Sequence, residues 1–475
     1  MRLTRAAARL PWPLLAVLAV QAALSVGLVR ARTAFGDEAL YLSAGHLEWS
    51  HWLHGTAIPS YQTWFSGAPV SYPPVGAIAD GLGGLAAARL LSLVLMLGVT
   101  SFAWGTAARL LGDKRAAFFA AALFAGLAPT LHLGSFATFD APALLLLTAA
   151  AWCAAGARGG QAATRRIVAA GILLALANAT KYATALYDPT VVCVAILSWW
   201  PPSGGRQAAL RRAALLAGTT AAAVAVLLAL GGPGYLTGIR VTTTGRAPGS
   251  DTASLVFADA WSWTAVVVVP AVVAAVACAV RRRWPQALLL AVLALSALLA
   301  PADQARIATA TSLNKHVDFG AWFAAIAAGY LLSGLSRRRV VLAVSLAALI
   351  GVTSVGAAQA RAMIDWPDVT GLVRVVRPMT THGGHFLVEI DDVLQYYLPK
   401  TTWRQWSNTA NSSPEYLQRA IARHYFSVVV LTYNQTPAND YAIALALSAA
   451  GGYQLAAKVR SGNIVCYVWE YAGRV

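Results

Sequence analysis

The sequence predicts a polytopic α-helical membrane protein of about eleven transmembrane helices, followed by a small C-terminal α/β domain. The chain has 475 residues, of which 58% are hydrophobic and only 12% charged, a composition too apolar for a soluble protein of this length. Eighteen of its 36 Lys and Arg residues form six groups of three, at alternate ends of the apolar runs. This alternation is the pattern of basic cytoplasmic loops.

The six basic groups are Arg2, Arg5, Arg9; Arg109, Lys114, Arg115; Arg158, Arg165, Arg166; Arg206, Arg211, Arg212; Arg281, Arg282, Arg283; and Arg337, Arg338, Arg339. The net charge of +17 comes largely from these groups, and no basic stripe interleaved with aromatic residues lies outside them. Nucleic-acid binding is therefore not expected. The four cysteines form no CxxC pair, so the sequence predicts neither a disulfide framework nor a cysteine metal site.

The apolar runs come close to the roughly 20 residues that a transmembrane helix needs. They lie at about residues 11–30, 82–108, 116–133, 141–157, 167–182, 184–200, 213–232, 259–280, 287–303, 317–335 and 340–359. An odd number of spans places the N-terminus in the cytoplasm and the C-terminal domain outside, in a multi-pass protein of the plasma membrane. We interpret the first run as an uncleaved helix rather than a signal peptide. The runs on either side of Lys181 also fit one long hairpin or a re-entrant segment.

Two segments are polar enough to lie outside the bilayer. The loop at residues 31–79 is rich in aromatic residues, which are typical of the membrane interface, and it belongs to a predicted transmembrane domain at residues 1–360. Residues 361–475 form the predicted extracytoplasmic α/β domain. In it, strand-like runs at 386–390, 427–433 and 464–469 alternate with helical stretches that begin after Pro414 and from Asp440.

Asp37 and Glu38 are the first candidate catalytic residues. They follow a glycine just beyond the outer end of the first helix, where a carboxylate can accept a proton from an incoming hydroxyl without entering the hydrocarbon. The alternative is a solvated helix cap.

A second set of candidates also falls on the outer side. Asp140 opens the fourth helix, where taken alone it is better suited to cap the helix N-terminus than to orient the acceptor or the base. Lys181 lies at the outer end of the fifth span, either as a lysine reaching for the interface or as a phosphate ligand. Arg306, Lys315 and His316 form a cationic patch before the tenth helix. Positive charge is normally depleted in outer loops, so orientation signals do not account for these cations.

These groups fit a transferase that uses a lipid-linked sugar. A sugar on a lipid phosphate leaves a phosphate monoester behind, and cations in a partly desolvated site stabilise that charge. A nearby carboxylate can deprotonate the acceptor hydroxyl. The chain has no Walker A loop and no Rossmann glycine signature, which agrees with a donor that is not a nucleotide.

The order of four short motifs resembles the GT-C membrane glycosyltransferases, in particular the bacterial branch similar to protein O-mannosyltransferases and lipid A aminoarabinose transferases. The motifs are Gly36-Asp-Glu-Ala-Leu-Tyr41, Tyr72-Pro-Pro-Val75, Phe139-Asp-Ala-Pro142 and Thr180-Lys-Tyr182, within residues 11–335. The resemblance implies a hexosyl- or pentosyltransferase that uses a polyprenyl-phosphate sugar and a lipid, glycan or protein acceptor.

By the same resemblance Asp37 is the catalytic base, while Asp140 is the family's helix-leading aspartate and Lys181 binds the donor phosphate. Lys315 and His316 occupy the place of a basic phosphate contact, and Tyr72 that of a donor-site residue. Some relatives carry an acid and a lysine before the Pro-Pro pair, where this chain has Ser71 and Tyr72. The cofactor therefore stays open between none and a divalent cation.

The rival prediction is a polytopic transporter or flippase of lipid-linked sugars. Such proteins usually show paired repeats and charges near the middle of the bilayer. This chain shows no repeat, and its ionisable residues outside the basic groups gather at one face, apart from Asp188. The sequence therefore favours the transferase.

Overall fold

The structure is a computed structural model, and it describes residues 11–157, 160–198, 205–434 and 436–473. The chain divides into two compact units, one formed by Met1–Val29 with Ser50–Ile364 and the other by Arg30–Trp49 with Asp365–Val475. The predicted boundary near residue 360 lies close to this division. The segment Arg30–Trp49, however, groups with the C-terminal residues, whereas the sequence prediction assigned it to the membrane domain.

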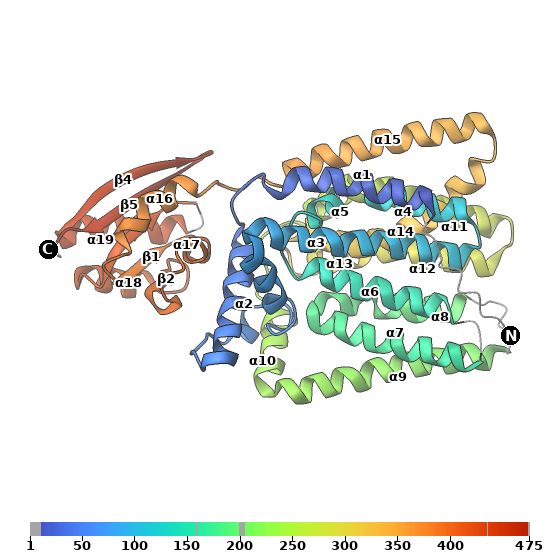
Figure 1. Cartoon of the computed structure of the whole chain (residues 1–475), viewed down its shortest axis with the longest axis horizontal. Coiled ribbons are helices and arrows are strands. Elements are labelled where there is room, and N and C mark those ends of the chain that lie inside the picture. The colour runs from blue at the N-terminus through green and yellow to red at the C-terminus, as the bar shows by residue number, and fades with distance from the viewer. Residues whose placement is uncertain (1–10, 158–159, 199–204, 435, 474–475) are drawn as a thin grey trace. The chain divides into compact units, whose positions relative to one another are not determined.

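The first unit is a helical bundle (Figure 1). Its α-helices are α1 (Trp12–Val29), α3 (Pro73–Leu111), α4 (Lys114–Ala125), α5 (Ala128–Leu133), α6 (Asp140–Ala155), α7 (Gly160–Thr180), α8 (Asp188–Leu197), α9 (Gly205–Gly231), α10 (Pro233–Thr242), α11 (Ala253–Val280), α12 (Trp284–Leu295), α13 (Leu299–Arg306), α14 (Leu313–Leu335) and α15 (Arg339–Ala362). Short 3-10 turns are η1 (Tyr61–Thr63), η2 (Tyr182–Tyr187) and η3 (Ser296–Leu298).

The helices match the predicted apolar runs. In the described part of the chain, eight helical segments are long and apolar enough to cross a membrane, counting α12 to α13 as one. The other three predicted runs fall on shorter helices, namely α4 with α5, α6, and η2 with α8. The protein is therefore a multi-pass membrane protein, while the number eleven stays a prediction.

Helix α14 forms the centre of the bundle, and most of its residues are buried. It packs against α4, α11 and α12. Gly329 permits a close approach to α4, because a Cβ at this position would lie 2.5 Å from the carbonyl oxygen of Ala116. Figure 1 shows α14 running through the bundle together with α1 and α3. The first turn of α14 carries Lys315 and His316, and its buried residues Leu313 and Val317 pack against Val256 and Ala260 of α11.

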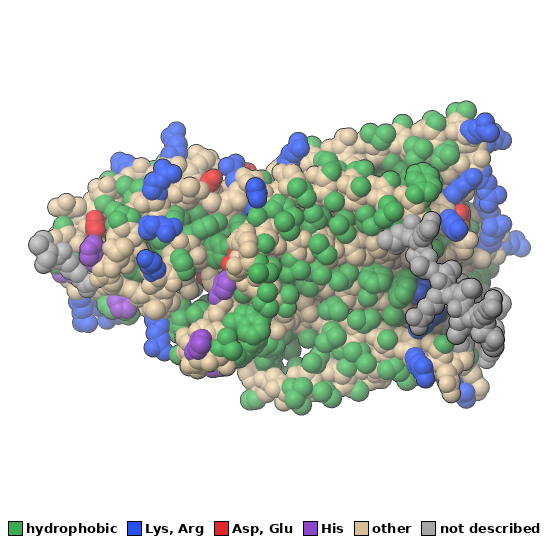
Figure 2. All heavy atoms as spheres, viewed as in Figure 1, with side chains coloured by type: hydrophobic (Ala, Val, Ile, Leu, Met, Phe, Trp, Pro, Cys, Tyr) green, Lys and Arg blue, Asp and Glu red, His purple; other side chains and the backbone are tan. Residues whose placement is uncertain are grey.

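The basic groups that the structure describes lie at one end of the bundle. Figure 2 shows Lys and Arg side chains gathered there, while the flanks are covered by hydrophobic side chains. Arg2, Arg5, Arg9 and Arg158 lie outside the described residues. Basic groups are typical of the cytoplasmic ends of transmembrane helices. We therefore predict that this end of the bundle faces the cytoplasm.

The predicted outer loop at residues 31–79 contains regular structure. Helix α2 spans Gly36–His54, η1 follows, and α3 begins at Pro73. Helix α3 is interrupted at Gly83 and Gly84, whose backbone angles are not helical. The second of these glycines has a φ of 66°, which favours glycine because no Cβ clashes there.

The second unit contains a five-stranded sheet of order β2-β1-β3-β5-β4. Its strands are β1 (His385–Val388), β2 (Trp406–Asn408), β3 (Phe426–Leu431), β4 (Tyr453–Ser461) and β5 (Ile464–Tyr471). Its helices are α16 (Thr370–Met379), α17 (Asp391–Tyr397), η4 (Trp403–Gln405), α18 (Pro414–Ala422) and α19 (Pro437–Ala450), together with most of α2. The three strands predicted from the sequence correspond to β1, β3 and β5, and the two predicted helices to α18 and α19.

The sheet is parallel on one side and antiparallel on the other. Strand β1 pairs in parallel with β2 and β3, whereas β5 pairs antiparallel with β3 and β4. Strands β1 and β3 are almost wholly buried, which explains why they read as continuous apolar runs. Strand β4 alternates polar and apolar residues and was not predicted.

Candidate functional site

A buried ion group forms in the first unit, around the side chain that begins α6. Asp140 is fully buried, and its Oδ1 lies 3.2 Å from Lys181 Nζ and 3.8 Å from His316 Nε2. The other carboxylate oxygen accepts a hydrogen bond of 2.9 Å from the hydroxyl of Thr138. Asp140 does not cap the helix, since the N-cap residue is Phe139. A buried carboxylate is stable when it is paired and hydrogen-bonded, as it is here.

Lys181 is held at the junction of α7 and η2. Its backbone is extended, and its amide donates to the carbonyl of Ala177. The segment after η1 fastens this junction from the other side, because Ala68 N donates to Ala179 O and Tyr182 N donates to Ser66 O. Gly67 lies between these two contacts, and a Cβ there would be only 2.0 Å from the Thr180 carbonyl oxygen. The lysine side chain is only 4% exposed, so it does not reach into solvent.

Adjacent residues on α14 supply two further groups. His316 Nδ1 lies 2.7 Å from Gln304 Nε2, so the amide can hold the ring while Nε2 turns toward Asp140. Lys315 Nζ lies 5.4 Å from the centre of the Phe136 ring. It is also buried, with 3% exposure. The first turn of α14 thus contributes a histidine at the ion group and a second buried cation next to it in the sequence.

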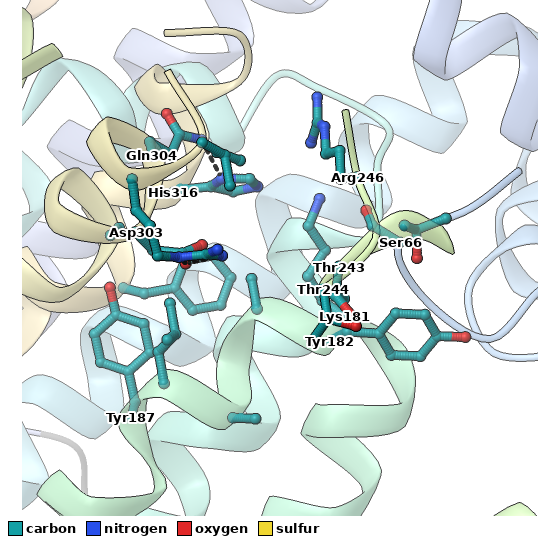
Figure 3. A pocket seen from close by; sticks show the side chains of 18 residues that line it. Ser66, Lys181, Tyr182, Tyr187, Thr243, Thr244, Arg246, Asp303, Gln304 and His316 are labelled. Atoms are coloured by element: carbon teal, nitrogen blue, oxygen red, sulfur yellow. Dashed lines mark hydrogen bonds and ion pairs between the residues drawn. The ribbon is translucent and has the colours of Figure 1, made fainter. Parts of the chain in front are cut away.

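Lys181 and His316 line a cavity of about 360 Å³. Figure 3 shows Lys181 and Arg246 on one side of this cavity and His316 with Gln304 on the other. The rest of the lining combines apolar side chains and the rings of Tyr182 and Tyr187 with hydroxyl groups, one carboxyl group and one guanidinium group. The apolar side chains include Leu186, Ile307 and Phe319, and the polar ones are Ser66, Thr242, Thr243, Thr244, Asp303 and Arg306. An apolar wall with a few convergent cations suits a ligand that joins an anionic group to an apolar one.

Two other predicted residues lie at or beside this site. Arg306 lines the cavity but is 60% exposed, and its Nε and one terminal nitrogen both donate to Asp303 Oδ1, at 3.1 and 2.8 Å. Tyr72 is buried at the start of α3, and its ring lies 5.6 Å from that of Phe139. It supports the residue before Asp140 and is not part of the cavity lining.

Asp37 and Glu38 lie in the second unit, in the first turn of α2. Glu38 is fully buried and accepts a hydrogen bond of 3.0 Å from Phe35 N, which makes it the group that satisfies the start of the helix. Asp37 is half-buried. Burial, with the charges of Asp391 and Asp37, raises the pKa of Asp392 to about 8. The second unit therefore concentrates carboxyl groups around the start of α2.

Three residues near the ion group were not singled out from the sequence. Arg246 and Gln304 line the cavity, and Arg89 is buried on α3, where it donates to the carbonyl of Val29 at 2.8 Å. Arg246 carries the same signal that drew attention to Lys181, a cation on an outer segment away from the basic groups. Gln304, in the polar end of α13, carries no charge, and Arg89 lies inside the apolar run of α3, so neither gave this signal.

A metal site was left open by the sequence. Within the described residues, no group of three or more His, Cys, Asp or Glu side chains is arranged to hold a metal ion. Whether the protein uses a divalent cation therefore stays open, as in the sequence-based prediction.

The chain was compared with known proteins. The family model for dolichyl-phosphate-mannose-protein mannosyltransferases matches residues 58–235, which is less than half of the chain. This range contains Tyr72, Asp140 and Lys181. No curated protein sequence matches the chain.

Solved structures match over nearly the whole chain. ArnT from Cupriavidus metallidurans in the apo state gives a TM-score of 0.65 at 14% identity and covers 96% of this chain and 97% of its own. The same protein bound to undecaprenyl phosphate gives 0.60 at 13% identity, with the same coverage. The oligosaccharyltransferase of Archaeoglobus fulgidus gives 0.58 at 14% identity and covers 92% of this chain and 72% of its own.

A mycobacterial arabinofuranosyltransferase, AftD, adds a TM-score of 0.57 at 15% identity, covering 96% of this chain and 40% of its own. Sequence identities this low establish the fold alone. Each of these matches covers at least 92% of this chain and therefore extends into both units. The chain therefore has the GT-C fold of membrane glycosyltransferases.

Proposed function

We propose that this protein is a glycosyltransferase that moves a sugar from a polyprenyl-phosphate donor to an acceptor hydroxyl at the outer face of the membrane. The observation that carries the proposal is the cavity of about 360 Å³ in which Lys181, Arg246 and His316 converge beside apolar walls. One matched structure was solved with undecaprenyl phosphate bound, which supports the same ligand class here.

The charge change in the reaction explains why cations are needed. The donor is a phosphodiester with one negative charge, and cleavage of the anomeric C–O bond leaves a polyprenyl phosphate with two. Lys181 and Arg246 would bind this phosphate, and the acquired charge would strengthen both contacts as the bond breaks. His316 would contribute a hydrogen bond from its ring. Lys315, buried in the same turn of α14, would add positive potential.

Asp140 would act through the cations. Its contacts with Lys181 and His316 support a role in fixing both side chains at the cavity wall. This differs from our sequence-based expectation that it orients the acceptor or the base. A buried carboxylate also offsets part of the positive charge, so that the empty site is stable.

Asp37 would be the general base, with Glu38 fixing the helix start that carries it. The base removes the acceptor proton, the acceptor oxygen bonds to the anomeric carbon, and the donor phosphate leaves. A single displacement of this kind inverts the anomeric centre.

The test uses the purified full chain in lipid nanodiscs with a panel of polyprenyl-phosphate sugars. We expect donor consumption, by transfer or by slow hydrolysis, for at least one sugar. Lys181→Ala should raise the donor concentration needed, whereas Lys114→Ala, in an exposed basic group, should behave as wild type. Donor movement between leaflets without any chemical consumption would instead identify a transporter.

A further inference from the structure

The segment that leads into α2 is fastened by residues from the far end of the chain, all within the second unit. Trp366 Nε1 donates to the carbonyl of Thr33 at 2.8 Å. Val369 N donates to the hydroxyl of Thr33 at 3.1 Å, and that hydroxyl in turn donates to the carbonyl of Pro367 at 3.4 Å. Thr33 is therefore bonded through both its backbone and its side chain to residues 366–369.

The next two residues are fixed as well. The amide of Ala34, which is only 2% exposed, donates to the hydroxyl of Tyr397 at 2.7 Å. The ring of Phe35 packs edge-on against Trp366, with ring centres 5.3 Å apart. The amide of Phe35 donates to the carboxylate of Glu38. Three consecutive residues thus have defined partners immediately before Gly36, where α2 begins.

Helix α17 reaches the same region at both of its ends. Its last residue, Tyr397, accepts the hydrogen bond from Ala34 N. Its second residue is Asp392, whose pKa is raised by burial and by the charges of Asp391 and Asp37. Both ends of α17 therefore lie near the start of α2. Because Asp37 is the second residue of α2, a shift of Thr33 or Ala34 would move its carboxylate with the helix start.

We infer that Trp366 and Tyr397 are positioning residues for Asp37, so that the C-terminal domain is a working part of the catalytic centre rather than a cover or an acceptor-selecting appendage. This inference rests on the proposed function. General-base catalysis depends on placement, and a misplacement of about 1 Å costs a reaction roughly a hundredfold. Residues 366–397 make five contacts with residues 33–35, which fixes the three residues that precede α2.

The experiment uses Trp366→Phe and Tyr397→Phe in the full chain. Tyr397→Phe removes the hydroxyl and keeps the ring, and Trp366→Phe removes the indole N–H and keeps an aromatic side chain. Trp406→Phe and Tyr453→Phe are matched controls in the same unit. They remove the contacts of Trp406 with Thr401 and of Tyr453 with the Phe426 carbonyl, which lie outside the segment. Amide hydrogen exchange over residues 30–40 should accelerate in the two test variants and stay unchanged in the controls.

The second readout is the rate of donor consumption, measured alone and with Asp37→Asn. Each test variant should lower the maximal rate by about tenfold or more, while the donor concentration for half-maximal rate changes less than twofold. In the Asp37→Asn background the same substitutions should have almost no further effect, because a positioning residue acts through the group it positions.

The outcomes separate this inference from the proposed function. If Asp37→Asn itself retains full rate, the assignment of the base fails, whatever the exchange data show. If Asp37→Asn abolishes the reaction while the test variants match their controls, or remain equally harmful without Asp37, the positioning role is overturned.

Discussion

The two units gather opposite charges. In the helical unit, Lys181, Arg246 and His316 surround a cavity and one buried carboxylate fixes two of them. In the second unit, Asp37, Glu38 and Asp392 gather about the start of α2. Phosphate binding needs cations and proton abstraction needs a carboxylate. The residues proposed to bind phosphate therefore belong to one compact unit, and the residue proposed to remove the proton belongs to the other.

The largest effect on activity is expected from replacing the proposed base in the second unit. Asp37→Asn removes the proton acceptor with almost no change in shape, and general bases contribute about 10²–10⁴ in rate. We expect sugar transfer to fall by that factor, measured with a radiolabelled polyprenyl-phosphate sugar in nanodiscs. Asp365→Asn, an exposed acid of the same unit, is the control. Transfer within threefold of wild type in Asp37→Asn would remove this residue from the role.

The buried ion group of the helical unit should show itself in stability. Asp140→Asn leaves Lys181 and His316 facing a neutral amide, and breaking a buried pair from one side costs about 3–5 kcal/mol. We expect a much lower unfolding temperature in detergent. The double variant Asp140→Leu with Lys181→Met should recover most of the loss, because both charges of the 3.2 Å ion pair are then removed together. If the double variant is less stable than Asp140→Asn, the pair does not account for the cost.

The acidic cluster of the second unit predicts a smaller, pH-dependent effect. The pKa of Asp392 is raised to about 8, above its unfolded value of about 4. The neutral form is therefore favoured on folding, and this contribution to stability is full below about pH 4 and is lost as pH rises through 8.

Asp392→Asn stays neutral, so the unfolding temperature of the variant should fall less than that of wild type between pH 5 and pH 9. A difference of about 1 kcal/mol corresponds to roughly 2–4 °C. Thermal unfolding followed by tryptophan fluorescence measures it, with Asp365→Asn as control. Parallel curves for wild type and Asp392→Asn would contradict a neutral Asp392.

Much of the fold followed from local patterns. Long apolar runs and alternating basic groups predicted the helices of the bundle, and β1, β3 and β5 stand out because buried strands read as apolar runs. Strand β4 lies at the edge of the sheet and its residues 454–460 are exposed or half-buried, so its sequence has no continuous apolar run. The three-residue strand β2 is too short for any periodicity.

The site was predicted in part, and the division has a physical cause. Lys181, His316 and Asp140 are ionisable residues at the ends of apolar runs, so the sequence identifies each of them separately as a candidate. Their meeting depends on the packing of α6, α7 and α14, to which residues far apart in the sequence contribute. The attachment of Thr33 to Trp366 spans 333 positions along the chain, and no local pattern records it.

The most direct test of the division of roles is equilibrium binding of undecaprenyl phosphate to the full chain in nanodiscs. Binding to wild type, Lys181→Ala and Asp37→Asn should be compared under identical salt and lipid. We predict that Lys181→Ala weakens binding by about tenfold or more, the loss expected for one charge-assisted phosphate contact, while Asp37→Asn binds within twofold of wild type. Equal binding by wild type and Lys181→Ala, or a large loss in Asp37→Asn alone, would contradict the account.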